Sequence, residues 1–125
     1  MGEEQIHFFH ENGFHVIQNY VNVQVKMEII IANGVVSVYN RGTCIYDRSL
    51  KDAYNQTFFI AEIIRIYKDE LSVSEDRLAT VSEVERKHLE KYVIPCEKQR
   101  VETYVFLSTH VDAIVLAYEN YMKQK

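Results

Sequence analysis

The sequence predicts an α+β protein in which an N-terminal antiparallel β-meander of four or five strands precedes a central helix and a C-terminal helical hairpin. Three observations lead to this order. The first third of the chain alternates apolar and polar side chains with period two and is interrupted by Asn-Gly pairs. From Asp47 to Leu71, apolar residues then recur at three- and four-residue steps. After residue 71 the chain combines helix-capping patterns with a further apolar stripe and one proline.

The N-terminal meander is predicted from alternation and turn chemistry. Asn-Gly favours a two-residue hairpin turn because both residues accept positive φ. Residues 21–31 alternate strictly, and we expect one long strand that is buried on one face. The expected strands are 6–10, 14–18, 21–31, 35–39 and 43–46, with turns at Asn12-Gly13, Asn33-Gly34 and Asn40-Arg41-Gly42.

The central helix is expected from Asp47 to Leu71. Its polar residues form one stripe, and apolar residues fill the rest of its circumference. A sheet of four or five strands covers only one side of such a helix. The C-terminal helices or a second subunit must cover the other side, and we therefore expect a homo-oligomer.

Two capping-box patterns mark the next region. Ser72 with Glu75 and Ser82 with Glu85 both have the required spacing, so residues 73–92 are expected to form one helix or two. We expect Pro95 to end this helical region, because the residue before a proline avoids the α conformation.

The tail leaves two interpretations. A three- and four-residue spacing continues through residues 96–123, which favours one long helix. Val101, Thr103, Val105 and Leu107 also alternate as in a strand, which a helix would then follow. With a single long helix, residues 73–124 form the helical hairpin.

Length and composition restrict the class of protein. A chain of 125 residues is expected to form a single domain, 1–125. The net charge of −4 and the absence of a Lys/Arg-rich block disfavour nucleic-acid binding. The longest apolar run is too short to span a bilayer, and the acidic start MGEEQ does not resemble a signal peptide. We therefore expect a cytoplasmic protein that does not enter the membrane, with Cys44 and Cys96 as free thiols.

The sequence does not predict an enzyme. None of the motifs GxSxG, HExxH, Walker A or GxGxxG occurs, so we expect no catalytic residues and no cofactor. His10 and His15 would stand opposite each other across a two-residue turn. Two imidazoles make half of a zinc site, and no third ligand is suitably spaced. The favoured interpretation is a polar pair on a solvated face, with metal binding as the alternative.

Three arginines and three tyrosines form a further candidate set, and four of the six lie close to the predicted turn and helix start. Guanidinium groups suit phosphate or carboxylate, and tyrosine rings can stack on a base. A nucleotide-like anion is therefore a candidate ligand, against the alternative that the arginines pair with nearby carboxylates. The candidate ligand-binding residues are Arg41, Arg48, Arg100, Tyr39, Tyr46 and Tyr104.

These features favour a small cytoplasmic non-enzymatic binding protein, an inhibitor or adaptor that acts on a protein partner. Nine tyrosines support a binding surface, because tyrosine is enriched at interfaces. The first alternative is an oligomeric protein that captures a nucleotide-like anion at an inter-subunit pocket. The second is a helix-turn-helix DNA-binding regulator built from residues 72–92, although Glu83 and Glu85 would then face phosphate.

Overall fold

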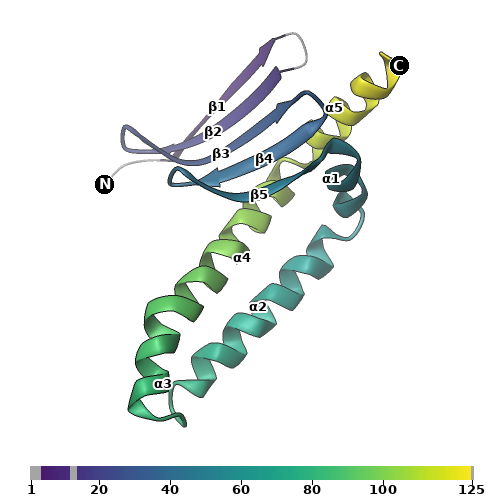
Figure 1. The fold of residues 1–125 in the computed structure, drawn as a ribbon. Helices are drawn as coiled ribbons and strands as arrows, with labels where there is room; N and C mark the ends of the chain where they lie inside the picture. Colours follow the sequence, from purple (N-terminus) through teal and green to yellow (C-terminus); the bar gives the residue numbers. More distant parts are fainter. Residues whose placement is uncertain (1–3, 12–13, 125) are drawn as a thin grey trace.

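The computed structural model describes the backbone of residues 4–11 and 14–124 (Figure 1). Within these residues a five-stranded antiparallel sheet precedes the helices, which confirms the predicted α+β class. The strands follow one another across the sheet in chain order, as in a meander. They are β1 (Glu4–Glu11), β2 (Phe14–Val21), β3 (Gln24–Ala32), β4 (Val35–Asn40) and β5 (Thr43–Ser49). The helical elements are α1 (Leu50–Thr57), α2 (Ile60–Arg77), α3 (Glu83–His88), the π-helical turn η1 (Leu89–Val93), α4 (Ile94–Thr109) and α5 (Val111–Lys123).

Residues with positive φ form tight turns between the strands. Asn33 and Gly34 have φ of 53° and 74°, as expected for the second Asn-Gly pair. Asn22, at φ 61°, makes a turn that the sequence analysis missed. The long strand predicted for residues 21–31 is therefore divided between the end of β2 and β3, and Val23 in this turn is 91% exposed. The predicted turn at Asn12-Gly13 lies outside the described residues.

One face of the sheet carries the core. The strand register aligns Ile17, Ile29 and Val38 in a row across β2, β3 and β4, and all three are buried. Because side chains alternate between the two faces of a strand, this row lies on one side of the sheet. Helices α1, α4 and α5 cover that side (Figure 1), and Leu107 of α4 belongs to the same core.

The predicted helix from Asp47 to Leu71 is wrong at both ends and in its middle. Its first three residues belong to β5, and α1 begins after Ser49, whose Oγ accepts a hydrogen bond from the N–H of Asp52 at 3.1 Å. The helix is then interrupted because Phe59, at φ −139° and ψ 25°, leaves the helical region. This break separates α1, which lies on the sheet, from α2, which extends away from it (Figure 1).

One of the two predicted capping boxes is confirmed. The Oγ of Ser82 accepts a hydrogen bond from the N–H of Glu85 at 3.3 Å, and α3 begins there. Ser72 and Glu75 instead lie inside α2, so the box predicted at these residues is wrong. The hairpin is made by α2 on one side and α3, η1 and α4 on the other (Figure 1), and not by residues 73–124 alone.

Pro95 does not end a helix, in contrast to the expectation. A proline inside a helix removes a hydrogen bond, and its ring clashes with the carbonyl four residues earlier. Here the π-helical turn η1 comes first, and the N–H of Ile94 donates to the carbonyl of Leu89, five residues back. Just before Pro95, the π turn therefore joins residues that are five apart instead of four. The helix passes the proline without a break and continues directly into α4.

The segment 96–123 is helical, which excludes the strand interpretation, but it is not one helix. His110, at φ −123° and ψ 28°, separates α4 from α5. The hydroxyl groups of Ser108 and Thr109 donate to carbonyls three residues earlier, at 2.6 and 2.7 Å. Such bonds compete with the helical ladder and often accompany a bend. The bend allows α5 to follow the sheet while α4 continues into the hairpin.

Gly34 and Gly42 provide a matched test of the turns. Both have positive φ, but a Cβ atom on Gly34 would lie 3.1 Å from Cζ of Tyr121, whereas one on Gly42 would meet nothing within 4 Å. We expect Gly42→Ala to lower the free energy of unfolding by about 1 kcal/mol through backbone strain. We expect Gly34→Ala to lower it by about 2 kcal/mol or more, because the ring must also move. Urea denaturation measures both losses, and equal losses would contradict the Tyr121 contact.

Candidate functional site

Three tyrosine rings join the sheet to the helical hairpin. Tyr46 of β5, Tyr67 of α2 and Tyr104 of α4, here named the tyrosine cluster, meet edge to face. The ring centroids lie 5.6 Å apart for Tyr46 and Tyr104 and 5.1 Å apart for Tyr67 and Tyr104. The buried hydroxyl of Tyr46 donates to Oε1 of Gln56 at 2.6 Å. Burial raises the pKa of both Tyr46 and Tyr104 above the ordinary value of a tyrosine, because the apolar surroundings disfavour the phenolate.

Two of the predicted ligand-binding arginines flank the tyrosine cluster. The Cζ atom of Arg48 lies 5.6 Å from the ring centroid of Tyr46, and that of Arg100 lies 3.9 Å from the ring centroid of Tyr67. Arg100 also forms an ion pair with Glu70 of α2. Its Nε atom is buried and has no hydrogen-bond partner among the described residues.

A pocket of about 440 Å³ opens beside the tyrosine cluster, between β5, α2 and α4, and we name it the arginine pocket. The structure thus brings together four of the six predicted ligand-binding residues, although Tyr46 does not itself line the pocket. The pocket is lined by Ile45, Arg48, Tyr67, Cys96, Glu97, Gln99, Arg100 and Tyr104.

Arg41 and Tyr39 lie apart from this pocket. The guanidinium of Arg41 is 4.0 Å from Oε1 of Glu102, and Nζ of Lys26 is 3.8 Å from Oε2 of the same carboxylate. Tyr39 lies next in sequence to the buried Val38, so its side chain projects from the opposite face of β4. A ligand role for any of the six residues stays a prediction.

The backbone pairs His10 with His15, as predicted for this hairpin. The side chain of His10 is outside the described part of the chain, so metal binding by the pair stays a prediction. No group of three or more histidine, cysteine, aspartate or glutamate side chains suited to a metal ion occurs within residues 4–11 and 14–124, so far as their side chains are described. Cys44 and Cys96 are free and exposed.

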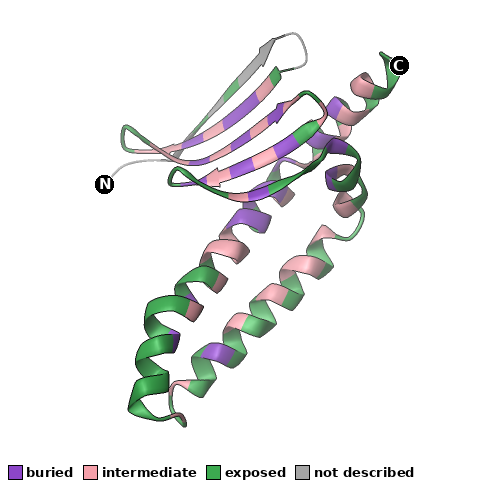
Figure 2. Cartoon of the chain, viewed as in Figure 1, coloured by how far each residue is buried: buried purple, intermediate pink, exposed green. Residues whose placement is uncertain are grey.

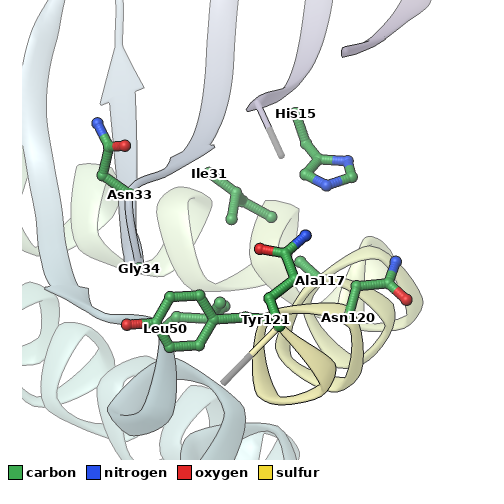
Figure 3. Close-up of a pocket in the computed structure, with 9 residues that line it drawn as sticks. His15, Ile31, Asn33, Gly34, Leu50, Ala117, Asn120 and Tyr121 are labelled. Atoms are coloured by element: carbon green, nitrogen blue, oxygen red, sulfur yellow. The ribbon is translucent and has the colours of Figure 1, made fainter. Parts of the chain in front are cut away.

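A second pocket, of about 200 Å³, lies between the sheet and α5 (Figure 3). In the close-up, the ring of Tyr121 extends toward Leu50, while His15 and Asn120 lie on the other side. Among the described side chains, no arginine or lysine lines this space. The lining residues are His15, Ile31, Asn33, Gly34, Leu50, Ala117, Asn120, Tyr121 and Gln124.

The outer part of α2 makes few buried contacts. Among the 18 residues of this helix, all of them described, only Ser74 is buried. Phe59, at its N-terminal cap, and Ile66 and Val73 are 51%, 43% and 59% exposed. Ile66 and Val73 lie within α2 and are seven residues apart, close to two helical turns, so these two side chains lie on one side of the helix. Figure 2 shows that exposed residues prevail along the hairpin away from the sheet.

A shallow groove of about 440 Å³ lies on this side of the hairpin, and we name it the hairpin groove. A helical stripe looks the same in a sequence whether it faces a core or a partner, so the sequence did not single out this groove. The sequence signal for the groove was the seven-residue spacing of Ile66 and Val73, with charged residues between them. The groove is lined by Ile66, Asp69, Glu70, Val73 and Ser74 of α2 and by Glu97 of α4.

The predicted helix-turn-helix segment, residues 72–92, forms the tip of the hairpin. Its two helices lie side by side along the hairpin (Figure 1), and the second continues through η1 into α4. DNA binding by this segment stays a prediction.

Comparison with known proteins gives no assignment. No family model matches the chain, and no curated protein or solved structure matches it significantly. Among the described residues, no helix is both long and apolar enough to cross a membrane.

His110 is a buried ionisable residue at the bend between α4 and α5. Its ring centroid lies 4.9 Å from that of Phe106 and 6.0 Å from that of Phe8. Its Nε2 atom is buried without a hydrogen-bond partner in the described part of the chain. Burial lowers the pKa of this imidazole, because the apolar surroundings disfavour its charged form.

We expect His110 to make the fold less stable at acid pH. In the unfolded chain this imidazole takes up a proton at a higher pH than it does in the folded chain, because burial lowers its pKa only in the fold. The free energy of unfolding therefore falls as the pH drops below about 6.5, until the folded-state pKa is reached. His110→Gln cannot take up this proton, so its Tm should fall less than that of the unmodified chain between about pH 7.5 and about pH 5.5. Thermal denaturation at both pH values measures this, and equal declines would contradict the prediction.

Proposed function

We propose that this chain is a cytoplasmic non-enzymatic binding protein, an inhibitor or adaptor that docks on a protein partner through its helical hairpin. One observation carries the proposal: α2 buries only Ser74 among its 18 described residues, while Ile66 and Val73 share an exposed side. An amphipathic helix normally covers its apolar stripe, and an exposed apolar surface on a soluble protein often marks an interaction site.

The attachment of the hairpin supports this role. The N-terminal half of α2 contacts the core through Ile60, Ile63, Ile64 and Tyr67. Further along the same helix, Glu70 pairs with an arginine of α4 and links the two sides of the hairpin. A binding surface that is already folded loses less conformational entropy when it meets its partner.

Replacing both Ile66 and Val73 by serine tests the docking surface. The two side chains are exposed, so each change should alter the free energy of unfolding by less than about 0.5 kcal/mol. The double variant should lose a stoichiometric protein partner that the unmodified chain retains in native mass spectrometry after gentle purification from cells that naturally contain it. The matched control is Val84→Ser with Leu116→Ser, two exposed apolar residues outside the groove, and it should retain the partner.

The outcomes of this experiment are distinct. An unmodified chain without any protein partner would contradict the proposed function. A partner retained by the Ile66→Ser, Val73→Ser variant would contradict docking through the hairpin.

Capture of a nucleotide-like anion is a second candidate function. It is supported by Arg48 and Arg100, which lie beside tyrosine rings at one pocket of suitable size. This pocket lies within one chain, so the predicted homo-oligomer is not required to complete it. Homo-oligomer formation and DNA binding stay predictions.

Thermal shift with a panel of mononucleotides and dinucleotides tests the second candidate. A ligand that binds only the folded chain stabilises it by about 2.7 kcal/mol at a concentration one hundred times its Kd, and so raises the Tm. Arg48→Gln combined with Arg100→Gln should abolish the rise measured against the ligand-free variant. Arg41→Gln should retain it, because Arg41 pairs with Glu102 outside the pocket. No rise with any nucleotide, or a rise that survives the double change, would remove this candidate.

A further inference from the structure

We infer that the hairpin groove receives a cationic amphipathic helix of the protein partner. This inference rests on the proposed function and specifies the chemistry of the partner. It depends on the apolar floor of the groove, on the carboxylates at its edge, and on a buried carboxylate oxygen that has no partner within the described residues.

The floor of the groove fits an apolar helix face. Ile66 and Val73 are seven residues apart, which places them about 10.5 Å apart along the axis of α2. A partner helix presents its own apolar side chains at the same seven-residue interval. Ser74, a small and buried residue of α2, also lines the groove.

Three carboxylates, those of Asp69, Glu70 and Glu97, line the same groove. Two of them already have cationic partners within the chain. Asp69 accepts from Arg65 at 3.2 Å, and Glu70 pairs with Arg100.

Glu97 is different from the other two carboxylates. It has no ion pair within residues 4–11 and 14–124, so far as their side chains are described, and its Oε1 atom is buried without a hydrogen-bond partner there. A buried carboxylate oxygen is costly to leave unpaired. A lysine or arginine of the partner, placed beside its apolar face, would supply a charge-assisted hydrogen bond to Glu97.

The same charges disfavour other occupants. A second copy of this chain would bring a further set of carboxylates to the groove, and the chain as a whole already carries a net charge of −4. Nucleic acid and anionic lipid headgroups would also meet Asp69 and Glu97 with like charge. A cationic amphipathic helix matches both the apolar floor of the hairpin groove and the carboxylates at its edge.

The test uses the full chain and a fluorescein-labelled synthetic peptide of about 18 residues, long enough for several helical turns. The peptide carries leucine at helical i, i+3, i+4 and i+7 positions and lysine on the opposite face and flanks. One control peptide has the same residues in scrambled order, and another has glutamate in place of every lysine. Fluorescence anisotropy at about 0.15 M salt limits the contribution of non-specific charge attraction.

We expect the chain to bind the cationic amphipathic peptide at least tenfold more tightly than either control peptide. Ile66→Ser with Val73→Ser should weaken this binding at least tenfold, and Glu97→Gln should weaken it and reduce its dependence on salt. Val84→Ser should bind as the unmodified chain does. Each variant is first compared with the unmodified chain by circular dichroism and Tm, so that a folding defect is not mistaken for lost binding.

Three results would overturn the inference. They are equal binding of the scrambled peptide, equal binding of the glutamate peptide, and binding that survives the Ile66→Ser, Val73→Ser change. Self-association that this double change abolishes, measured by analytical ultracentrifugation, would also overturn it by identifying a second copy as the occupant. If the native partner is lost from the double variant but the peptide does not bind, docking through the hairpin stands and only the chemistry assigned to the partner fails.

Discussion

The contact among Tyr46, Tyr67 and Tyr104 is the interaction on which the rest of the structure depends. It is the place where the last strand of the sheet, the first arm of the hairpin and the second arm meet. Each ring supplies a large apolar area, and edge-to-face pairs add about 0.5–1.5 kcal/mol beyond burial. Because the outer half of α2 has so little buried area of its own, the direction of the hairpin is set at this contact. The arginine pocket lies beside it.

Features with a local cause were predictable from the sequence. Alternation predicted the buried row that contains Ile29, because a half-buried strand requires period two. Asn33-Gly34 predicted its turn through positive φ, and Ser82 predicted the start of α3 through its capping oxygen. Each of these signals is contained in a few neighbouring residues, so one sequence was sufficient to detect it.

Features set by distant contacts were not predictable. The helical period is the same on both sides of Phe59, so the break there has no local signature. The contact of Arg100 with Tyr67 joins residues on two helices that meet only after the chain reverses. The place where Arg48, Arg100 and Tyr104 meet therefore required the fold, and their role as ligand-binding residues stays a prediction. In the same way, the helical stripe that contains Ile66 does not show from the sequence alone whether it faces the core or a partner.

The π-helical turn before Pro95 has a consequence for helical phase. A π turn accommodates one extra residue within an α-helix, and one residue corresponds to a rotation of about 100° about the axis. Everything after η1 is therefore turned relative to α3, including Glu97, which lies only four residues beyond the turn. A chain that lost one residue from Leu89–Val93 would regain a regular helix, and α3 would then be turned about its axis relative to α4, which Arg100 and Tyr104 hold against α2. The direction in which the tip of the hairpin presents its side chains thus depends on the length of η1.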